Sequence, residues 1–469
     1  MNVGRGRPSV PGPAIVPLTA PSIASIAAAA PGSTRDGLAR ILRLGLVMLG
    51  LTVFSGVFFV TGEAETTARL SRGAVEGSRL VQTTLGLVFL LALVLIACGH
   101  LRELGATLWA NRWFTALILL CLASTAWSAA PGVSFRRSIA LVGQVLTAYA
   151  FTRGLRTMDV VRMVLIFYTI ITVAAFITRP FAPELVTMQW EQDGNYLFRG
   201  FFDHKNSYGR ALSQAIVLGA ACLLAGSLRA FGAWVAVGTC AIALVASWSK
   251  SGMVALTVVL PTYLVLLVCT RPPPLGGARS TRFEPPLRRL PAKPVLLGAA
   301  SLLGLIAGLG LLLAIQVDTT LTGRTYIWEE AIRTGLRRPL LGHGFGAFWL
   351  GDLGASSSLH EALGWTVLSA HNAFIDIWLD LGGLGIVLLA GWLVMLAWRF
   401  LARLRREPLT PANAALPFVF VHFLVMAMTG GAYLAYLNVT WFIFLMFFFT
   451  DRPAEPSVIA ADPPTQSRR

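Results

Sequence analysis

Histidine, arginine and asparagine side chains that could bind and activate a substrate occur in short polar segments between long apolar stretches. His371 and Asn372 come just before the apolar stretch that starts at residue 373, and Arg324 stands in the segment Gly-Arg-Thr-Tyr-Ile-Trp. A neutral imidazole can take a proton from a hydroxyl group near neutral pH. A guanidinium binds phosphate through two parallel hydrogen bonds. These residues predict a site that acts on an anionic, phosphorylated substrate.

Further cations and polar groups extend this candidate site. Lys250 lies between two serines and is one of three lysines in a chain that otherwise uses arginine. Its compact charge suits a phosphate. Helix N-termini with cations nearby bind anions. The aromatic ring of Trp328 could stack on a sugar. The remaining candidate substrate-binding residues are Arg136, Arg137, Arg199, His204, Lys205, Asn206, Trp328 and Asn372.

Each of these residues also has a structural interpretation. His371 could cap a helix, and Arg324 could pair with a neighbouring glutamate at the membrane surface. Lys250 could be a loop residue whose ammonium reaches water, and Trp328 an ordinary interfacial anchor. Asp203 could stabilise a re-entrant segment around His204. The residues alone leave both sets of interpretations open.

The composition indicates an all-α integral membrane protein. The 469-residue chain is 55% hydrophobic and 13% charged, whereas soluble domains contain about 25% charged residues. Apolar runs of about 17–25 residues recur, the length of a membrane-spanning helix. The net charge of +16 would suggest nucleic acid for a soluble protein, but here basic loops fix the topology, and no nucleic-acid partner is expected.

We predict about twelve transmembrane helices from these runs. Most basic residues fall in the segments on the same side as the two termini. Cytoplasmic loops carry an excess of lysine and arginine, so both termini are expected in the cytoplasm. The polar segments of the candidate site then share the opposite, outer face. The expected spans are residues 41–60, 81–98, 113–128, 138–152, 160–178, 209–226, 231–248, 252–269, 295–315, 373–398, 414–429 and 432–449.

The chain is expected to hold one membrane domain, residues 37–450, between disordered cytoplasmic tails at 1–36 and 451–469. Residues 270–294, rich in proline and arginine, predict a cytoplasmic linker.

One long loop on the outer face, residues 316–371, is expected between helices nine and ten. Within it, the sequence around Glu329 predicts a short helix, and the glycines at 342, 344 and 346 predict a tight turn. Long ordered loops on a helical scaffold tend to carry function.

Motifs for metal or nucleotide chemistry do not occur in the sequence. It contains no P-loop, no dinucleotide-binding glycine motif, no HExxH and no DxD-type carboxylate pair in a loop. The five cysteines lie in or beside apolar runs and form no CxxC pair. We therefore expect neither a metal nor a cofactor, and an activated lipid donor fits better than a nucleotide sugar.

An ordered set of segments resembles the O-antigen ligase/polymerase superfamily of bacterial inner-membrane glycosyltransferases, and most of all its exopolysaccharide polymerase branch. The segment Asp-His-Lys-Asn at 203–206 carries the likeness to the polymerase branch. Each segment is weak alone, but all occur in the right order. The segments are 127–137, 201–209, 247–251, 323–328, 339–344 and 371–382.

The resemblance implies a multi-pass bacterial inner-membrane enzyme with its active site on the periplasmic face. Members transfer glycan from undecaprenyl pyrophosphate to a sugar hydroxyl, with inversion and without metal or nucleotide. His371 would be the general base, while Arg324 and Lys250 would hold the pyrophosphate. Many ligases have arginine where this chain has Lys250. The implied partners are the lipid-linked oligosaccharide, the sugar acceptor, membrane lipids, and other polysaccharide assembly and chain-length proteins.

Two other functions compete with polymerisation of repeat units into exopolysaccharide. A ligase would transfer the glycan to a lipid core or a protein. A lipid-linked sugar transporter would need ionisable residues deep in several spans, or broken helices in matching halves. Few such residues and no matching halves are present in the sequence.

Overall fold

The computed structural model describes most of the apolar segments and the polar segments between them. The chain divides into two compact units, Met1–Leu42 and Arg43–Arg469. In the first unit, the described part is the start of helix α2. The described residues are 34–57, 79–189, 196–224, 230–270, 324–351, 354–364, 367–406, 411–430 and 433–450.

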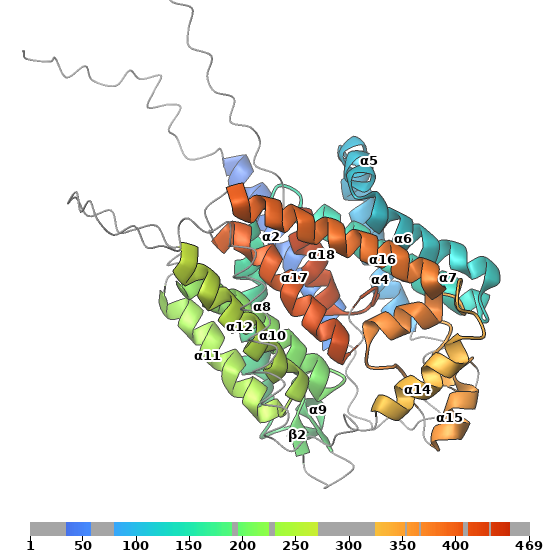
Figure 1. Ribbon diagram of the computed structural model, residues 1–469. Helices are drawn as coiled ribbons and strands as arrows, with labels where there is room; N and C mark the ends of the chain where they lie inside the picture. The colour runs from blue at the N-terminus through green and yellow to red at the C-terminus, as the bar shows by residue number, and fades with distance from the viewer. Residues whose placement is uncertain are drawn as a thin grey trace, which may run out of the picture. The chain divides into compact units, whose positions relative to one another are not determined.

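The described chain is mostly α-helical, as the composition predicts (Figure 1). Its elements are, in chain order, α2 (Thr34–Ser55), α4 (Arg79–Ala97), α5 (Leu101–Ala110), α6 (Arg112–Ala123), the 3-10 turn η2 (Ser124–Trp127), α7 (Pro131–Thr152), α8 (Thr157–Thr178), α9 (Pro183–Val186), β1 (Thr187–Gln189), β2 (Tyr196–Phe198), α10 (Lys205–Leu224), α11 (Ala230–Ser247), α12 (Lys250–Thr270), α14 (Arg324–Gly335), α15 (Ser357–Leu363), α16 (Ala373–Arg406), α17 (Pro411–Thr429) and α18 (Val439–Thr450).

Every expected span except 295–315 overlaps one of these helices, and 295–315 lies outside the described residues. Among the described helices, four are long and apolar enough to cross a membrane: residues 37–55 of α2, α4, α8, and residues 373–403 of α16. The pair α5 and α6 makes a fifth if it is one span, although the two helices meet at 99°. The chain is therefore an α-helical membrane protein, and the number twelve stays a prediction.

Two short strands depart from the all-α expectation. Thr187–Gln189 pairs antiparallel with Tyr196–Phe198, with Thr187 opposite Phe198. Strands of three residues are too short to show the alternating pattern that identifies a strand in a sequence. Together with α9, this hairpin forms part of the connection between α8 and α10, and it ends shortly before the polar segment at 203–206.

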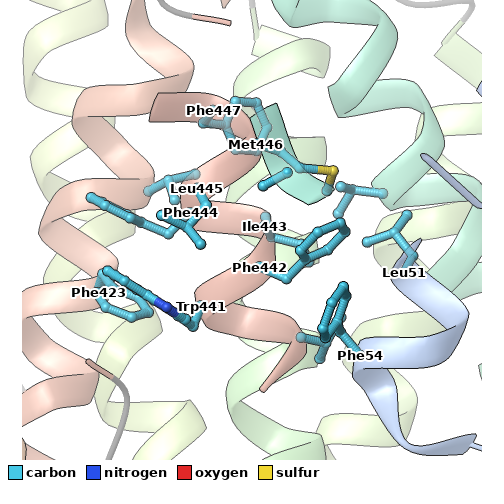
Figure 2. Packing of buried hydrophobic residues seen from close by; sticks show 14 of the residues in the cluster. Leu51, Phe54, Phe423, Trp441, Phe442, Ile443, Phe444, Leu445, Met446 and Phe447 are labelled. Carbon is cyan, nitrogen blue, oxygen red and sulfur yellow. The ribbon is translucent and has the colours of Figure 1, made fainter. Parts of the chain in front are cut away.

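The aromatic helix α18 lies at the centre of the larger core. All twelve of its residues are buried, and it contacts α7, α8, α10 and α17. Figure 2 shows Phe442 against Phe54 of α2, where the ring centroids are 4.4 Å apart. On another face, Trp441 stacks on Phe423 of α17, with centroids 5.6 Å apart. Aromatic packing thus joins helices from both ends of the chain into one scaffold.

The helices that carry the candidate site form two groups. The helices α10, α11 and α12 lie side by side, and α17 packs against α10 and α12 (Figure 1). The helices α10 and α12 approach closely at their first turns, where a Cβ atom on Gly252 would come within 2.5 Å of the carbonyl oxygen of Gly209. In the second group, α14 packs on α15 and on α16.

Two expectations for the long loop are confirmed. The sequence around Glu329 forms the helix α14, and Gly342, Gly344 and Gly346 all have positive φ angles in a turn. Positive φ is the region that favours glycine. The expected placement of this loop on the periplasmic face stays a prediction, and so do the domain boundaries.

Candidate functional site

His371 ends the long loop and stands one residue before the cap of α16. Its φ angle is 52°, in the left-handed region, and its side chain is exposed. Asn372 is buried and caps α16, since its Oδ1 accepts the backbone N–H of Phe374 at 3.0 Å and of Ile375 at 3.4 Å. Asn372 thus starts the helix, whereas the imidazole of His371 is left accessible to a substrate.

The peptide before His371 is held from both sides. The N–H of Ala370 donates to Oδ1 of Asp376 at 2.8 Å, and the indole N–H of Trp328 donates to the carbonyl oxygen of Ala370 at 2.7 Å. Asp376 is itself oriented by the indole of Trp349, which donates to the same oxygen at 2.8 Å. Trp328 therefore positions His371 in this structure, and its predicted contact with a sugar stays a prediction.

Three cationic or imidazole groups lie near enough to His371 to act on it electrostatically. Although the residue keeps exposed surface, partial desolvation of its imidazole, together with the electrostatic effect of Arg324, Arg210 and His204, lowers the pKa of His371 from 6.5 to about 4. Arg324 is the first residue of α14 and is half-buried, and burial lowers its pKa as well. An arginine still keeps its charge at neutral pH. The site thus pairs a neutral imidazole, able to accept a proton, with fixed positive charge.

The start of α10 contributes the predicted segment His204-Lys205-Asn206. The backbone N–H of Asn206 donates to Nδ1 of His204 at 3.0 Å, so this imidazole is a neutral acceptor at the helix start. Burial, aided by Arg210 and Lys205, lowers its pKa against the opposing charge of Asp203. Lys205 is buried, with a side chain 6% exposed. His204 therefore acts as a cap and lies close enough to His371 to affect its protonation.

Lys250 begins α12 next to this segment. The hydroxyl of Ser249 donates to Oδ1 of Asn206 at 3.3 Å, and Ser249 also accepts the N–H of Gly252 at 3.4 Å. Lys250 is half-buried, and the two helix starts meet through the glycine contact described above. Ser249, the neighbour of Lys250, thus meets Asn206 although the two are far apart in the sequence.

The first turns of α10, α12, α14 and α16 therefore belong to one site. The N-terminal end of a helix carries a partial positive charge. At three of these four ends, the side chains of His204, Ser249 and Asn372 already accept a backbone N–H. Helix ends with cations nearby favour an anion, and the binding of an anion by Arg324, Lys205 and Lys250 stays a prediction. Within the described residues, no three His, Cys, Asp or Glu side chains are grouped to hold a metal ion.

Other predicted substrate-binding residues hold the scaffold in this structure. The guanidinium of Arg199 donates to the carbonyl oxygens of Thr187, Phe202 and Glu184 at 2.9, 2.8 and 3.1 Å. It fixes the turn that follows the β-hairpin, and burial lowers its pKa. Its predicted role toward substrate remains untested.

Arg137 donates to the carbonyl oxygen of Gly346 in the glycine-rich turn, and its guanidinium lies 5.8 Å from the ring centre of Tyr436. Asp380 of α16 holds the same turn by accepting the N–H of Gly346 at 2.8 Å. Arg136 lies beside Arg137 in the first turns of α7. In this structure Arg137 positions the long loop, and substrate binding by Arg136 and Arg137 stays a prediction.

Arg210, Asp376 and Asp380 were missed in the sequence. Arg210 lies in a stretch assigned to a membrane span, and an ionisable residue there is a functional candidate by default. That signal alone could have identified it. The two aspartates stand four residues apart at the start of α16, on one face of the helix, but nothing in the sequence shows which loop atoms they bind.

Two comparisons relate the chain to known proteins. Residues 235–390, which include Lys250, Arg324 and His371, match the O-antigen ligase family Wzy_C. The chain is also 28% identical, over 316 residues, to the exopolysaccharide production protein ExoQ of Rhizobium meliloti (strain 1021). That similarity covers 65% of this chain and 68% of ExoQ. The chain is therefore similar to members of the O-antigen ligase/polymerase superfamily.

Proposed function

We propose that this protein polymerises oligosaccharide repeat units linked to undecaprenyl pyrophosphate into an exopolysaccharide at the periplasmic face of the inner membrane. The observation that carries the proposal is a neutral, accessible His371 beside Arg324 among several helix N-termini. The similarity to ExoQ, an exopolysaccharide production protein, supports polymerisation. The family match supports a glycosyltransferase.

The proposed reaction is a single displacement at the anomeric carbon, without metal. The acceptor hydroxyl oxygen forms the new glycosidic bond as the bond from the anomeric carbon to the pyrophosphate oxygen breaks. The bonding electrons leave with the lipid pyrophosphate, and the hydroxyl proton passes to His371. Attack from the opposite side inverts the anomeric centre.

Arg324 and Lys250 stabilise the negative charge that develops on the leaving pyrophosphate. Removing one such preorganised donor typically lowers kcat by about 10²–10³-fold. His371 contributes as general base, an effect of about 10²–10⁴-fold. Asn372 keeps the imidazole at the helix entrance by capping α16.

The test is complementation of a deletion strain with the wild type, His371→Ala and His100→Gln. His100 is a matched control because it lies far along the chain, at the start of α5. Surface glycans and lipid-linked glycans are sized, and the amount of protein in the membrane is measured. Single lipid-linked repeat units and no long polymer in His371→Ala alone are expected. Normal polymer in His371→Ala rules out this residue as the base and reopens the transporter interpretation.

A ligase is the second candidate, because the family matched by residues 235–390 is described as O-antigen ligase. A ligase would act on finished polymer rather than on single repeat units. In the same experiment, it predicts polymer of normal length that is not attached to its acceptor. The two functions are thus separated by the length of the glycan that accumulates.

A further inference from the structure

Arg210 is a charged residue in the second turn of α10, where the sequence predicts an apolar span. Its Nη2 donates to the hydroxyl of Ser207 at 3.2 Å, three residues earlier. Side chains on a helix tilt toward its N-terminus, so the guanidinium reaches back to the end of α10 that belongs to the site.

Two other elements meet the guanidinium there. Gly430, directly after α17, is buried, and a Cβ atom at this position would collide with Nη1 of Arg210. The charge of Arg210 also acts on His371, and the charges of Arg324 and Asp203 act on Arg210. The guanidinium therefore lies against the end of α17, near enough to Arg324 and His371 to interact electrostatically with both.

A buried polar pair holds this part of α10 in place. The hydroxyl of Ser213 donates to the carbonyl oxygen of Arg210 at 2.9 Å, and it lies 2.8 Å from Nε2 of His422 in α17. The side chain of His422 is fully buried. Because Ser213 donates to the carbonyl, His422 must donate to Ser213. The contact fixes α10 against α17 less than one turn after Arg210.

We propose that Arg210 is a further substrate-binding residue of this site, whose guanidinium binds a phosphate oxygen of the pyrophosphate group together with Arg324. The proposal rests on the proposed function, which supplies the pyrophosphate. Two like charges held near each other repel, and an anion between them removes that cost. A planar guanidinium can give two parallel hydrogen bonds to one phosphate in a fixed fork geometry, which an ammonium lacks.

The glycine beside Arg210 offers a test that leaves the arginine in place. Gly430→Ala adds one methyl group, and the atom it meets is the tip of a flexible side chain, so the guanidinium moves and the fold remains. Gly238→Ala, in α11, is the matched control, since a Cβ atom there meets nothing within 4 Å. Arg210→Gln removes the charge, and Arg210→Lys keeps it without the paired hydrogen bonds.

The first measurement is the Kd of inorganic pyrophosphate for the full-length protein in nanodiscs, with thermal melting as the control for folding. We expect Arg210→Gln and Gly430→Ala to raise the Kd about tenfold or more, Arg210→Lys to raise it less, and Gly238→Ala to leave it unchanged. A wild-type Kd in both Arg210→Gln and Gly430→Ala overturns the proposal.

The pH profile of transfer gives a readout that a purely structural role would not change. The groups that act electrostatically on His371 are Arg324, Arg210 and the imidazole of His204, and removing one positive charge makes the imidazole of His371 easier to protonate. The acid limb of the profile should therefore move to higher pH in Arg210→Gln and stay in place in Arg210→Lys. An acid limb unchanged in Arg210→Gln contradicts the placement of Arg210 beside His371.

The outcomes separate this inference from the proposed function. Loss of pyrophosphate binding in Arg324→Gln but not in Arg210→Gln, with active wild-type enzyme, refutes the inference alone. Arginine-dependent pyrophosphate binding, without glycan transfer by the wild type, refutes the proposed function and leaves the binding site. Wild-type protein that binds no pyrophosphate refutes the inference.

Discussion

Replacing Trp328 by phenylalanine should slow catalysis without removing any group that touches substrate in the proposed reaction. The indole donates to the carbonyl oxygen of Ala370 at 2.7 Å, and Ala370 is fully buried. A hydrogen bond of this kind contributes about 0.5–1.5 kcal/mol, and a buried acceptor left without a donor costs about 1–3 kcal/mol. Phenylalanine keeps the ring and removes only the donor.

The magnitude of the rate effect follows from the backbone of the next residue. His371 has φ 52°, and left-handed backbone costs about 1–2 kcal/mol for a residue with a side chain. The hydrogen bonds to Ala370 hold this conformation. Losing about 1.4 kcal/mol of that support lowers the ratio of active to inactive backbone about tenfold. We therefore expect kcat to fall by up to tenfold in Trp328→Phe, with little change in the KM of the donor.

The assay is elongation of a synthetic lipid-linked oligosaccharide by purified enzyme in nanodiscs. Trp378→Phe is the matched control, since it loses an indole bond to the carbonyl oxygen of Pro339, 3.2 Å long, elsewhere on α16. Asp376→Asn acts on the same peptide as Trp328→Phe, so the double variant should lose less than the sum of the two. Equal kcat in Trp328→Phe and Trp378→Phe would refute this account of how His371 is positioned.

Three other outcomes are expected. Since His371 must be neutral to accept a proton and its pKa is about 4, activity should be nearly equal at pH 7.5 and 5.5; an ordinary pKa of 6.5 would lower it about tenfold at pH 5.5. Arg324→Lys should lower kcat/KM far more than Arg333→Lys on the same helix, and equal effects would contradict a paired phosphate contact. Gly382→Ala should destabilise the protein by about 1–3 kcal/mol in thermal melting, because φ is 66° and the added Cβ meets the backbone of Leu340. Gly383→Ala, whose Cβ comes no closer than 3.5 Å to the carbonyl oxygen of Pro339, should not.

The sequence allowed prediction of those parts that depend on local pattern. Apolar runs located the helices, and the glycines predicted the turn at 342–346. The resemblance selected Lys250, Arg324 and His371, and the structure places the last two near each other. These features are readable because a run, a turn residue or a motif is contained in one short segment.

Features that depend on contacts between distant segments could not be predicted. Arg199 was predicted to bind an anion because it is a cation in a polar segment. Its three carbonyl partners instead come from α9, β1 and the turn after β2. Trp328 resembles an interfacial anchor, yet its partner Ala370 is 42 residues away. Arg210 could have been recognised by its charge within an expected span, but span assignment averages over about 19 residues and one charge does not change the result. Its contact with Gly430, 220 residues away, could not be predicted.

The meeting of four helix starts has a consequence for the conditions in which the site holds an anion. The partial charges at helix ends come from peptide dipoles, which do not titrate. Acidification changes the imidazoles of His204 and His371, but it leaves this peptide contribution unchanged as long as the helices persist. Dissolved salt does weaken it, because mobile ions screen exposed charge over about 8 Å at physiological ionic strength. Ionic strength, more than acidity, should therefore set how tightly the donor is held.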